Sequence, residues 1–214
     1  KRLDRIAVCG RAKNLLYSDL VNVPGKLYEK RVVLYIADTV SLISALVSLD
    51  GSVKELCPIS TLSDKEELIH LLSLGEFDAV VSDMEESYLE VFRHQNISCV
   101  NVAELDSCDE EQLNYHKQNT TWLIPTSGTT SRPKLVRHKL ASLASSALKK
   151  SKNYRSDAEV WGQFYDFTRY AGYQVLLNSL LNGHTLVASS SSEQINERVR
   201  LCAKKFVTHI SATP

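Results

Sequence analysis

Nine consecutive residues carry the clearest chemistry in the sequence. Thr126 to Lys134 reads Thr-Ser-Gly-Thr-Thr-Ser-Arg-Pro-Lys, and five of its first six residues bear a hydroxyl group. Hydroxyl groups and backbone amides donate hydrogen bonds to phosphate oxygens, and glycine lets the backbone approach them closely. Arg132 and Lys134 add positive charge that offsets phosphate charge. This composition is what a loop that binds a polyphosphate requires.

Three other kinds of segment share features with Thr126 to Lys134: a Walker A loop, the nucleophile elbow of a serine hydrolase and an ordinary surface turn. A Walker A loop needs a second glycine five residues after the first and a Ser or Thr after its lysine, but Gly128 has no such partner and Leu135 follows Lys134. No G-x-S-x-G elbow surrounds Ser127, so a serine hydrolase is not indicated. An ordinary surface turn also has this composition, and composition alone favours that interpretation.

The elements around the loop alternate between strands and helices. The apolar run at residues 121–124 predicts a strand that leads directly into the loop. Ser63 and Ser192 are placed to cap two of the helices, with Glu66 in the capping-box position after Ser63. Further strands are expected at 31–36, 55–59, 79–81, 97–102, 160–164, 185–188 and 206–210, and helices at 39–49, after the cap Ser63, and at 84–94, 139–150, 173–181 and 193–204. This alternation predicts an α/β fold of layered, parallel-rich sheets with crossover helices.

The polar, acidic stretch at 108–119 marks a predicted boundary between two subdomains. The first is expected to span residues 1–118, and the second residues 119–214, beginning with the strand that leads into the loop. The chain begins with Lys1 rather than Met and ends at Pro214 after an apolar run, so we expect a piece of a longer protein.

Composition excludes several classes of function. Lysine plus arginine equals aspartate plus glutamate at 25 each, so no net charge attracts nucleic acid. No secretion signal and no run of roughly 20 apolar residues is present, which predicts a cytoplasmic protein without membrane insertion. The five cysteines are widely spaced and fit free thiols, and neither they nor the six histidines have metal-ligand spacing. No structural zinc is expected.

The order of residues in TSGTTSRPKLV resembles the signature of the adenylate-forming (AMP-binding) family, T-S-G-T-T-G-x-P-K-G-V. Ser131 and Leu135 stand where that signature has its two later glycines, and Ser131 makes a positive φ more costly. Leu16 to Leu20 and Val207 to Pro214 are similar to two other family segments. Eight of the ten specified positions match, namely Thr126, Ser127, Gly128, Thr129, Thr130, Pro133, Lys134 and Val136.

The resemblance implies an AMP-forming ligase of the acyl-CoA synthetase or adenylation-domain type. Such enzymes use ATP and Mg²⁺ to convert a small carboxylic acid into an acyl-adenylate, and often pass the acyl group to the thiol of CoA or of a phosphopantetheine on an acyl carrier protein. By resemblance, Lys134 positions the loop and Thr129 and Thr130 assist catalysis. The phosphate contacts would come from Thr126, Ser127, Gly128, Thr129, Thr130 and Ser131. The chain would be part of the large N-terminal domain, inactive without the rest of that domain and the C-terminal domain.

Spacing back from Gly183 places Arg169 and Tyr170 where the resemblance implies a residue lining the acyl pocket. An exposed arginine beside a core tyrosine is the alternative. Asp166 is expected to be a solvated or capping residue, and His138 either a loop residue or a histidine on a helix surface. Two other functions stay open: a non-catalytic relative that binds a nucleotide or acts as a scaffold, and an unrelated α/β nucleotide-binding module.

Overall fold

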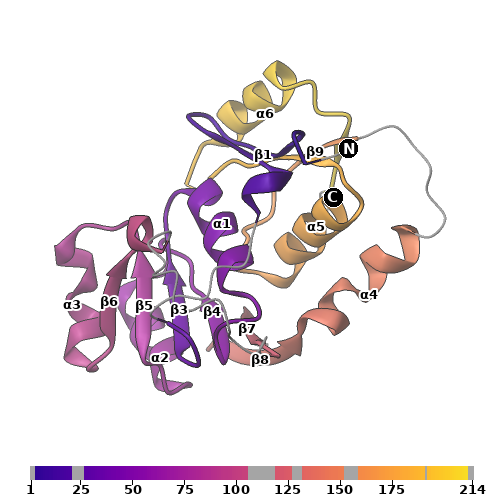
Figure 1. The fold of residues 1–214 in the computed structure, drawn as a ribbon. Coiled ribbons are helices and arrows are strands. Elements are labelled where there is room, and N and C mark those ends of the chain that lie inside the picture. Colours follow the sequence, from indigo (N-terminus) through magenta and orange to yellow (C-terminus); the bar gives the residue numbers. More distant parts are fainter. Residues whose placement is uncertain are drawn as a thin grey trace. The chain divides into compact units, whose positions relative to one another are not determined.

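A computed structural model describes residues 3–20, 27–105, 119–126, 132–151, 159–190 and 192–211. The chain forms two compact units, shown in Figure 1. One unit combines Lys1–Leu20 with Ala141–Pro214, and the other consists of Val21–Leu140. Each unit contains one sheet and is described by itself.

The Val21–Leu140 unit is built on a six-stranded sheet with strand order β6-β5-β3-β4-β7-β8. All neighbouring strands are parallel except β7 and β8, which are antiparallel. The strands are β3 (Arg31–Tyr35), β4 (Glu55–Pro58), β5 (Ala79–Ser82), β6 (Ser98–Asn101), β7 (Thr121–Thr126) and β8 (Lys134–Lys139). The central strands are apolar and buried, as parallel strands covered on both faces must be.

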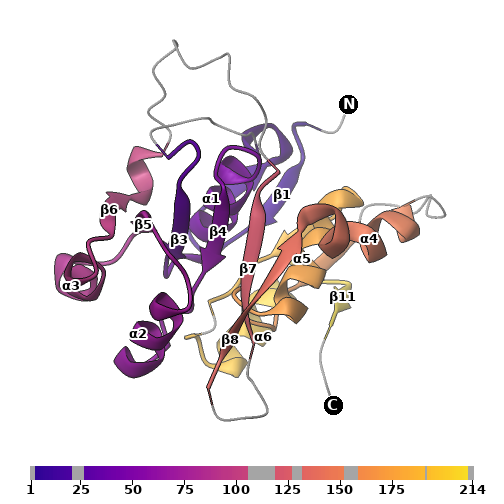
Figure 2. The same cartoon turned by 90° about the horizontal axis from the view of Figure 1, so that it is seen from below.

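Three helices connect the parallel strands of this sheet: α1 (Thr39–Leu49), α2 (Lys65–Ser73) and α3 (Glu86–His94). Figure 2 shows α2 and α3 on the same side of the sheet, and Leu68, Leu72 and Phe92 from these helices share one core cluster. A short 3₁₀ helix, η2 (Val102–Glu104), follows β6. The side chain of Asp38 caps α1 by accepting a hydrogen bond from the amide of Ser41, at 3.0 Å.

The second unit contains a five-stranded sheet with strand order β11-β9-β10-β1-β2. Its strands are β1 (Ile6–Cys9), β2 (Asn14–Leu16), β9 (Val160–Gly162), β10 (Thr185–Val187) and β11 (His209–Ile210), and its helices are η1 (Tyr17–Asp19), α4 (Leu140–Ser151), α5 (Tyr170–Leu181) and α6 (Ile195–Lys204). Helix α5 connects β9 to β10, and α6 connects β10 to β11. Only β2 runs antiparallel to its neighbour.

Alternation along β9 separates the two faces of this sheet. Val160 packs against a core cluster that contains Val187 from β10 and Leu201 from α6. Successive residues of a strand point to opposite faces, so Trp161 points away from that cluster. Gly162 returns to the α6 side, where an added Cβ would lie 3.0 Å from the Sγ atom of Cys202.

The predicted fold class is confirmed, since both sheets are mainly parallel and the connecting helices lie where the apolar spacing placed them. The expected boundary at residues 118 and 119 does not coincide with the edges of the units. Strand β7 pairs with β4, so it completes the sheet that precedes it in the chain. The chain then enters the other unit at residue 141. In that unit β1, near the start of the chain, pairs with β10, which lies almost 180 residues later in the sequence.

Several element boundaries also differ from the sequence-based ones. Asp64 rather than Ser63 caps α2, because its side chain accepts a hydrogen bond from Glu67 N at 2.8 Å. Helix α6 begins at Ile195 after the N-cap Gln194, not at Ser192. Helix α5 begins at Tyr170, three residues before the expected start. The last strand is shorter than predicted because Phe206, with φ of 55°, ends α6 in the left-handed region.

Strand β8 and the place of His138 differ from the sequence-based assignments. Residues 134–139 form strand β8, although residue 139 was expected to start a helix, so His138 lies opposite Trp122 in a sheet rather than in a loop or on a helix. Strands β1 and β2 near the N-terminus had no sequence-based prediction. Cys9, Cys57, Cys99 and Cys202 are free thiols as expected, and Cys108 lies outside the described residues.

Candidate functional site

The base of the phosphate-binding segment is an antiparallel hairpin made by β7 and β8. The register runs from Thr121 opposite Lys139 to Thr126 opposite Lys134. Thr126 Oγ1 also donates a hydrogen bond to Lys134 O at 3.4 Å. Thr126 and Lys134, which flank residues 127–133 in the sequence, are therefore held side by side at the end of the ladder.

Buried contacts fix the other end of β7. Trp122 donates its indole N–H to Asp50 Oδ1 at 2.8 Å. The hydroxyl of Thr120 donates to Val53 O at 2.7 Å and accepts from Gly51 N at 2.8 Å. These bonds join β7 to the turn between α1 and β4, so the strand that leads into the segment is anchored at its start.

Of the predicted phosphate-binding residues, only Thr126 and Lys134 belong to the described part of the chain. Ser127, Gly128, Thr129, Thr130 and Ser131 lie outside it. Arg132 and Lys134 are exposed, and no acidic side chain among the described residues pairs with either cation. Both positive charges therefore remain accessible to an anion beside the segment.

Two contacts at the base of the segment, made by His70 and Leu135, were not predicted from the sequence. His70 on α2 lies with Nε2 2.9 Å from Pro133 O, and the nitrogen must donate because a carbonyl oxygen only accepts. Leu135, which stands where the family signature has glycine, is half-buried and packs against the core cluster that contains Leu68 and Leu71. The leucine thus has a packing role at the base of the hairpin.

A hollow of about 360 Å³ lies in the other unit, beside α5. Its walls come from β9, from the turn after β9, and from the facing sides of α4 and α5. The lining residues are Ser146, Ala147, Trp161, Tyr165, Tyr170, Ala171, Gln174, Val175, Asn178 and Ser211. Tyr170, predicted to line an acyl pocket, is among them, whereas Arg169 is not.

The turn between β9 and α5 sets where Tyr170 lies. Asp166 Oδ1 accepts hydrogen bonds from the amide and the hydroxyl of Thr168, both at 2.7 Å, so this aspartate stabilises the turn. Arg169 N donates to Asp166 O at 3.1 Å, and α5 starts at the next residue. Gly172 allows the helix to approach the turn, because a Cβ there would lie 2.1 Å from Asp166 O.

A buried arginine holds the start of the same turn from the α6 side. Arg198 donates to Gln163 O and to Ser189 Oγ, both at 3.0 Å, and its guanidinium lies 5.1 Å from the centre of the Phe164 ring. Burial lowers the pKa of Arg198, although the carboxylate of Glu193 acts in the opposite direction. The arginine therefore links the carboxyl ends of β9 and β10.

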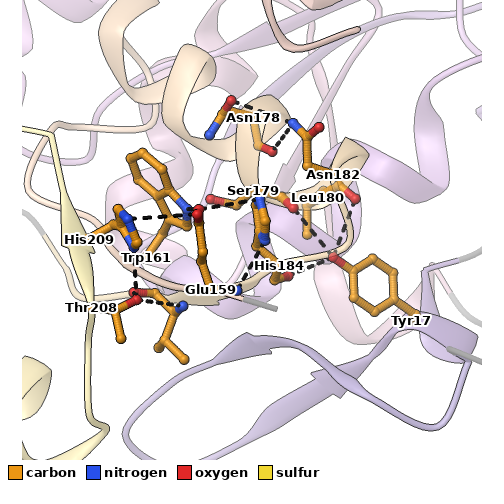
Figure 3. A network of polar contacts seen from close by, with 11 residues as sticks. Tyr17, Glu159, Trp161, Asn178, Ser179, Leu180, Asn182, His184, Thr208 and His209 are labelled. Atoms are coloured by element: carbon orange, nitrogen blue, oxygen red, sulfur yellow. Dashed lines mark hydrogen bonds and ion pairs between the residues drawn. The ribbon is translucent and has the colours of Figure 1, made fainter. Parts of the chain in front are cut away.

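The indole of Trp161 is held by a polar network that sequence reasoning missed. Figure 3 shows Glu159 with Trp161 and His209 on one side and His184 on the other. The indole N–H donates to Glu159 Oε2 at 2.8 Å, and the ring stacks on His209 with centroids 5.1 Å apart. The nearest histidine nitrogens lie 3.4 Å and 3.7 Å from the carboxylate oxygens.

Within this network the tautomer of His184 follows from its neighbours. Glu159 N donates to His184 Nδ1 at 3.2 Å, so a neutral ring carries its proton on Nε2, which faces the carboxylate. Tyr17 donates its hydroxyl to His184 O at 2.6 Å and so connects the N-terminal segment to the same place. These residues come from different elements, and only the sheet brings them together.

Neither a metal cluster nor a spanning helix is found in the described ranges. No group of three or more His, Cys, Asp or Glu side chains there could hold a metal ion. No helix there is both long and apolar enough to cross a membrane.

The chain combines a mainly parallel α/β fold with a hydroxyl-rich segment that lies between the paired strands β7 and β8 in the sequence. The sequence model of the AMP-binding enzyme family matches residues 27–214, so the chain belongs to that family. No curated protein matches the sequence.

Solved structures of adenylate-forming enzymes share this fold. The chain is similar to O-succinylbenzoate CoA synthetase (MenE) from Bacillus subtilis in complex with ATP and magnesium ion, with TM-score 0.74, 16% identity and coverage of 97% of this chain and 59% of that one. The same enzyme with the intermediate OSB-AMP gives TM-score 0.76, 18% identity and coverage of 98% and 58%. The NpsA N-terminal subdomain from Klebsiella oxytoca with 3-hydroxyanthranilyl-AMSN gives TM-score 0.74 and 17% identity, with coverage of 97% of this chain and 55% of that one. The chain thus spans less than two thirds of these structures.

Proposed function

We propose that the intact protein activates a small carboxylic acid with ATP. A carboxylate oxygen attacks the α-phosphorus, the bond from that phosphorus to the bridging oxygen of the β-phosphate breaks, and acyl-adenylate and pyrophosphate result. The observation that carries this proposal is the closing pair of Thr126 and Lys134, which holds together the two ends of the family's phosphate segment. Membership of the AMP-binding family supports the same reaction.

Each part of the segment has a proposed role. The backbone and hydroxyl groups of residues 126–131 bind the β- and γ-phosphates, and Lys134 positions the segment and offsets charge. Thr129 and Thr130 stabilise the departing pyrophosphate, so catalysis rests on positioning and electrostatics. Mg²⁺ would neutralise phosphate charge while keeping several waters as ligands.

The acyl group then passes to a thiol, either of CoA or of a phosphopantetheine on an acyl carrier protein. In that step the thiol sulfur attacks the acyl carbon, and AMP leaves. MenE, a CoA synthetase by name, supports CoA as the acceptor. We also propose a cytoplasmic location for the protein, and a place in the wall of the acyl pocket for Tyr170 but not for Arg169.

The test is carboxylate-dependent exchange of labelled pyrophosphate into ATP by the intact protein. The double variant Thr129→Ala, Thr130→Ala should lose at least about 100-fold in exchange rate, the scale observed when donors to a developing anion are removed. Ser145→Ala, which removes an exposed hydroxyl from α4, is the control and should keep full activity. Exchange that survives the double substitution would refute the proposal.

A second candidate is a relative that binds a nucleotide without turnover. Ser131 and Leu135, in place of two glycines, favour it, since a Cβ restricts the backbone of such a segment. Calorimetric titration with ATP separates the two functions. Binding of ATP without exchange for any acid in a broad panel would support the second candidate.

A further inference from the structure

The hollow beside α5 combines flat aromatic surface with neutral polar groups. Trp161, Tyr165 and Tyr170 contribute rings, while Gln174 and Asn178 contribute carboxamides one helical turn apart on α5. No charged side chain lines the hollow in the described part of the chain. Pockets of this kind bind a mostly apolar ligand and orient it through a few polar groups.

Trp161 is fixed before any ligand arrives. Its N–H bond to Glu159 and its stacking on His209 restrain both ends of the indole, as Figure 3 shows. Glu159 is itself only 14% exposed and lies within 4 Å of both histidines. A ring held in this way loses little conformational freedom when a ligand stacks on it, which favours binding of another flat ring.

The chemistry of the walls argues against two other classes of acid. An α-amino acid would bring an ammonium group that needs a carboxylate, but Asp166 is engaged by Thr168 and Glu159 by Trp161, and neither lines the hollow. A flexible alkyl acid would cover the carboxamides without bonding them, and a buried unsatisfied polar group is costly.

Both carboxamides can contact polar ring substituents. Gln174 uses one amide hydrogen on Leu143 O, at 3.0 Å, which orients the group. Asn178 accepts a hydrogen bond from Asn182 Nδ2 on its backbone oxygen at 2.7 Å and a longer one on its side-chain Oδ1 at 3.5 Å, so its own Nδ2 group is the part of the carboxamide that can donate to a ligand. Each side chain therefore retains hydrogen-bonding capacity toward a hydroxyl or amino substituent.

We propose that this hollow binds the ring of an aryl carboxylic acid bearing a hydrogen-bonding substituent, with Trp161 as the specificity-determining wall and Glu159 as its positioning residue. The proposal rests on the proposed activation of a carboxylic acid and names its substrate class. Aromatic contacts beyond simple burial are worth about 3- to 10-fold in affinity. The preference for a flat ring should therefore be measurable as the ratio of the dissociation constants of an aromatic acid and a saturated cyclic acid.

Fluorescence of the intact protein measures binding directly and needs no ATP. The sequence has two tryptophans, so Trp161→Phe identifies the part of the signal that comes from the hollow. 4-Hydroxybenzoate should quench Trp161, while cyclohexanecarboxylate, hexanoate and phenylalanine should bind about 3- to 10-fold more weakly or worse. Equal affinity for 4-hydroxybenzoate and cyclohexanecarboxylate would overturn the proposal.

Variants of Glu159 separate positioning from folding. The amide oxygen of Glu159→Gln still accepts from the indole, so this variant should keep the affinity for 4-hydroxybenzoate, whereas Glu159→Ala should lose about 3- to 10-fold. A matching near-ultraviolet circular dichroism signal shows that each variant is folded. Equal losses in both variants, or none in either, would contradict the positioning role.

Pyrophosphate exchange with the same four acids distinguishes failure of this proposal from failure of the proposed function. Exchange driven by hexanoate or phenylalanine but not by 4-hydroxybenzoate overturns the substrate class and leaves the activation reaction standing. Quenching by 4-hydroxybenzoate without exchange for any acid supports the ring site and refutes the activation reaction.

Discussion

Replacing Gly172 by alanine tests the construction of the turn that leads into α5. An added Cβ would lie 2.1 Å from Asp166 O, 2.7 Å from Asp166 C and 2.9 Å from Phe167 Cα. All three atoms are backbone atoms of a turn fixed by the Asp166 side chain, so no side chain can rotate away. The helix and the turn must separate by roughly 1 Å, starting from a contact well below van der Waals distance.

The expected cost follows from these distances. Inserting one methyl group into a packed site costs about 1–3 kcal/mol. The cost at Gly172 belongs at the upper end of that range, because the atoms that the methyl group would meet are backbone atoms of the turn. Alanine recovers up to about 1 kcal/mol because it is the better helix former. A net loss of about 2 kcal/mol in the free energy of unfolding should lower Tm by roughly 4–8 °C.

Gly75→Ala is the matched control. Its Cβ would lie 2.7 Å from Phe77 Cζ, but that atom is the far end of a side chain that can turn aside. The control should therefore lose less than about 1 kcal/mol, measured by thermal denaturation followed by circular dichroism. A Gly172→Ala protein with unchanged Tm, or one no less stable than Gly75→Ala, would refute the packing argument.

Three further predictions concern other parts of the chain. His70→Ala should raise KM for ATP by about 3- to 10-fold in the exchange assay, because one hydrogen bond to Pro133 O is lost, while His70→Gln keeps a donor and should stay near the parent value. The hydrogen bond from Arg11 lowers the pKa of Glu193 in the folded protein. The pair therefore stabilises the fold fully at pH values above the pKa of an unfolded glutamate, about 4.3, and this stabilisation is lost as the pH falls through the lower pKa of the folded state. Urea denaturation should thus show Arg11→Gln less stable than the parent at pH 7 and equally stable near pH 2; a constant difference would exclude the pairing. Burial raises the pKa of Cys57, so mass spectrometry after treatment with a thiol reagent at pH 8 should find Cys57 unmodified when half-buried Cys99 has reacted.

Local patterns in the sequence predicted the elements that bury their own apolar residues. Strand β3 and helix α1 lie within a residue or two of their expected ranges, because β-branched runs and helical spacing act over a few neighbours. Strand β8 has no such pattern, since Lys134, Arg137 and Lys139 face solvent on a strand at the edge of the sheet. Charged residues are usual on an edge strand, and β8 is a strand because β7 pairs with it.

The division of the chain could not be read from local patterns. Val8 pairs with Leu186, and no periodicity in either segment indicates the partner. The polar stretch near residue 110 looked like a boundary because linkers are often polar. The actual division instead follows which strands share a sheet, and that depends on contacts between residues far apart in the sequence.

The proposed phosphate site and the proposed acid site are encoded differently in this chain. The proposed phosphate contacts come from backbone amides and hydroxyl groups of one contiguous segment, so the order of residues from Thr126 to Lys134 sufficed to predict them. The hollow uses side chains mainly from α4, α5 and β9. The ring of Trp161 is held by Glu159 and by His209 of β11, and His184, the residue before β10, lies beside Glu159. Those histidines looked scattered in the sequence for this reason.

This difference has a kinetic consequence. Contacts made to the acid alone change its KM, whereas contacts made only in the transition state change kcat. Trp161 lies on a strand of one unit and the phosphate segment belongs to the other, so they share no element. Trp161→Leu should therefore raise KM for an aryl acid by about 10-fold while KM for ATP stays within about 2-fold. A parallel rise in both constants would show that the substitution disturbs the fold rather than a binding wall.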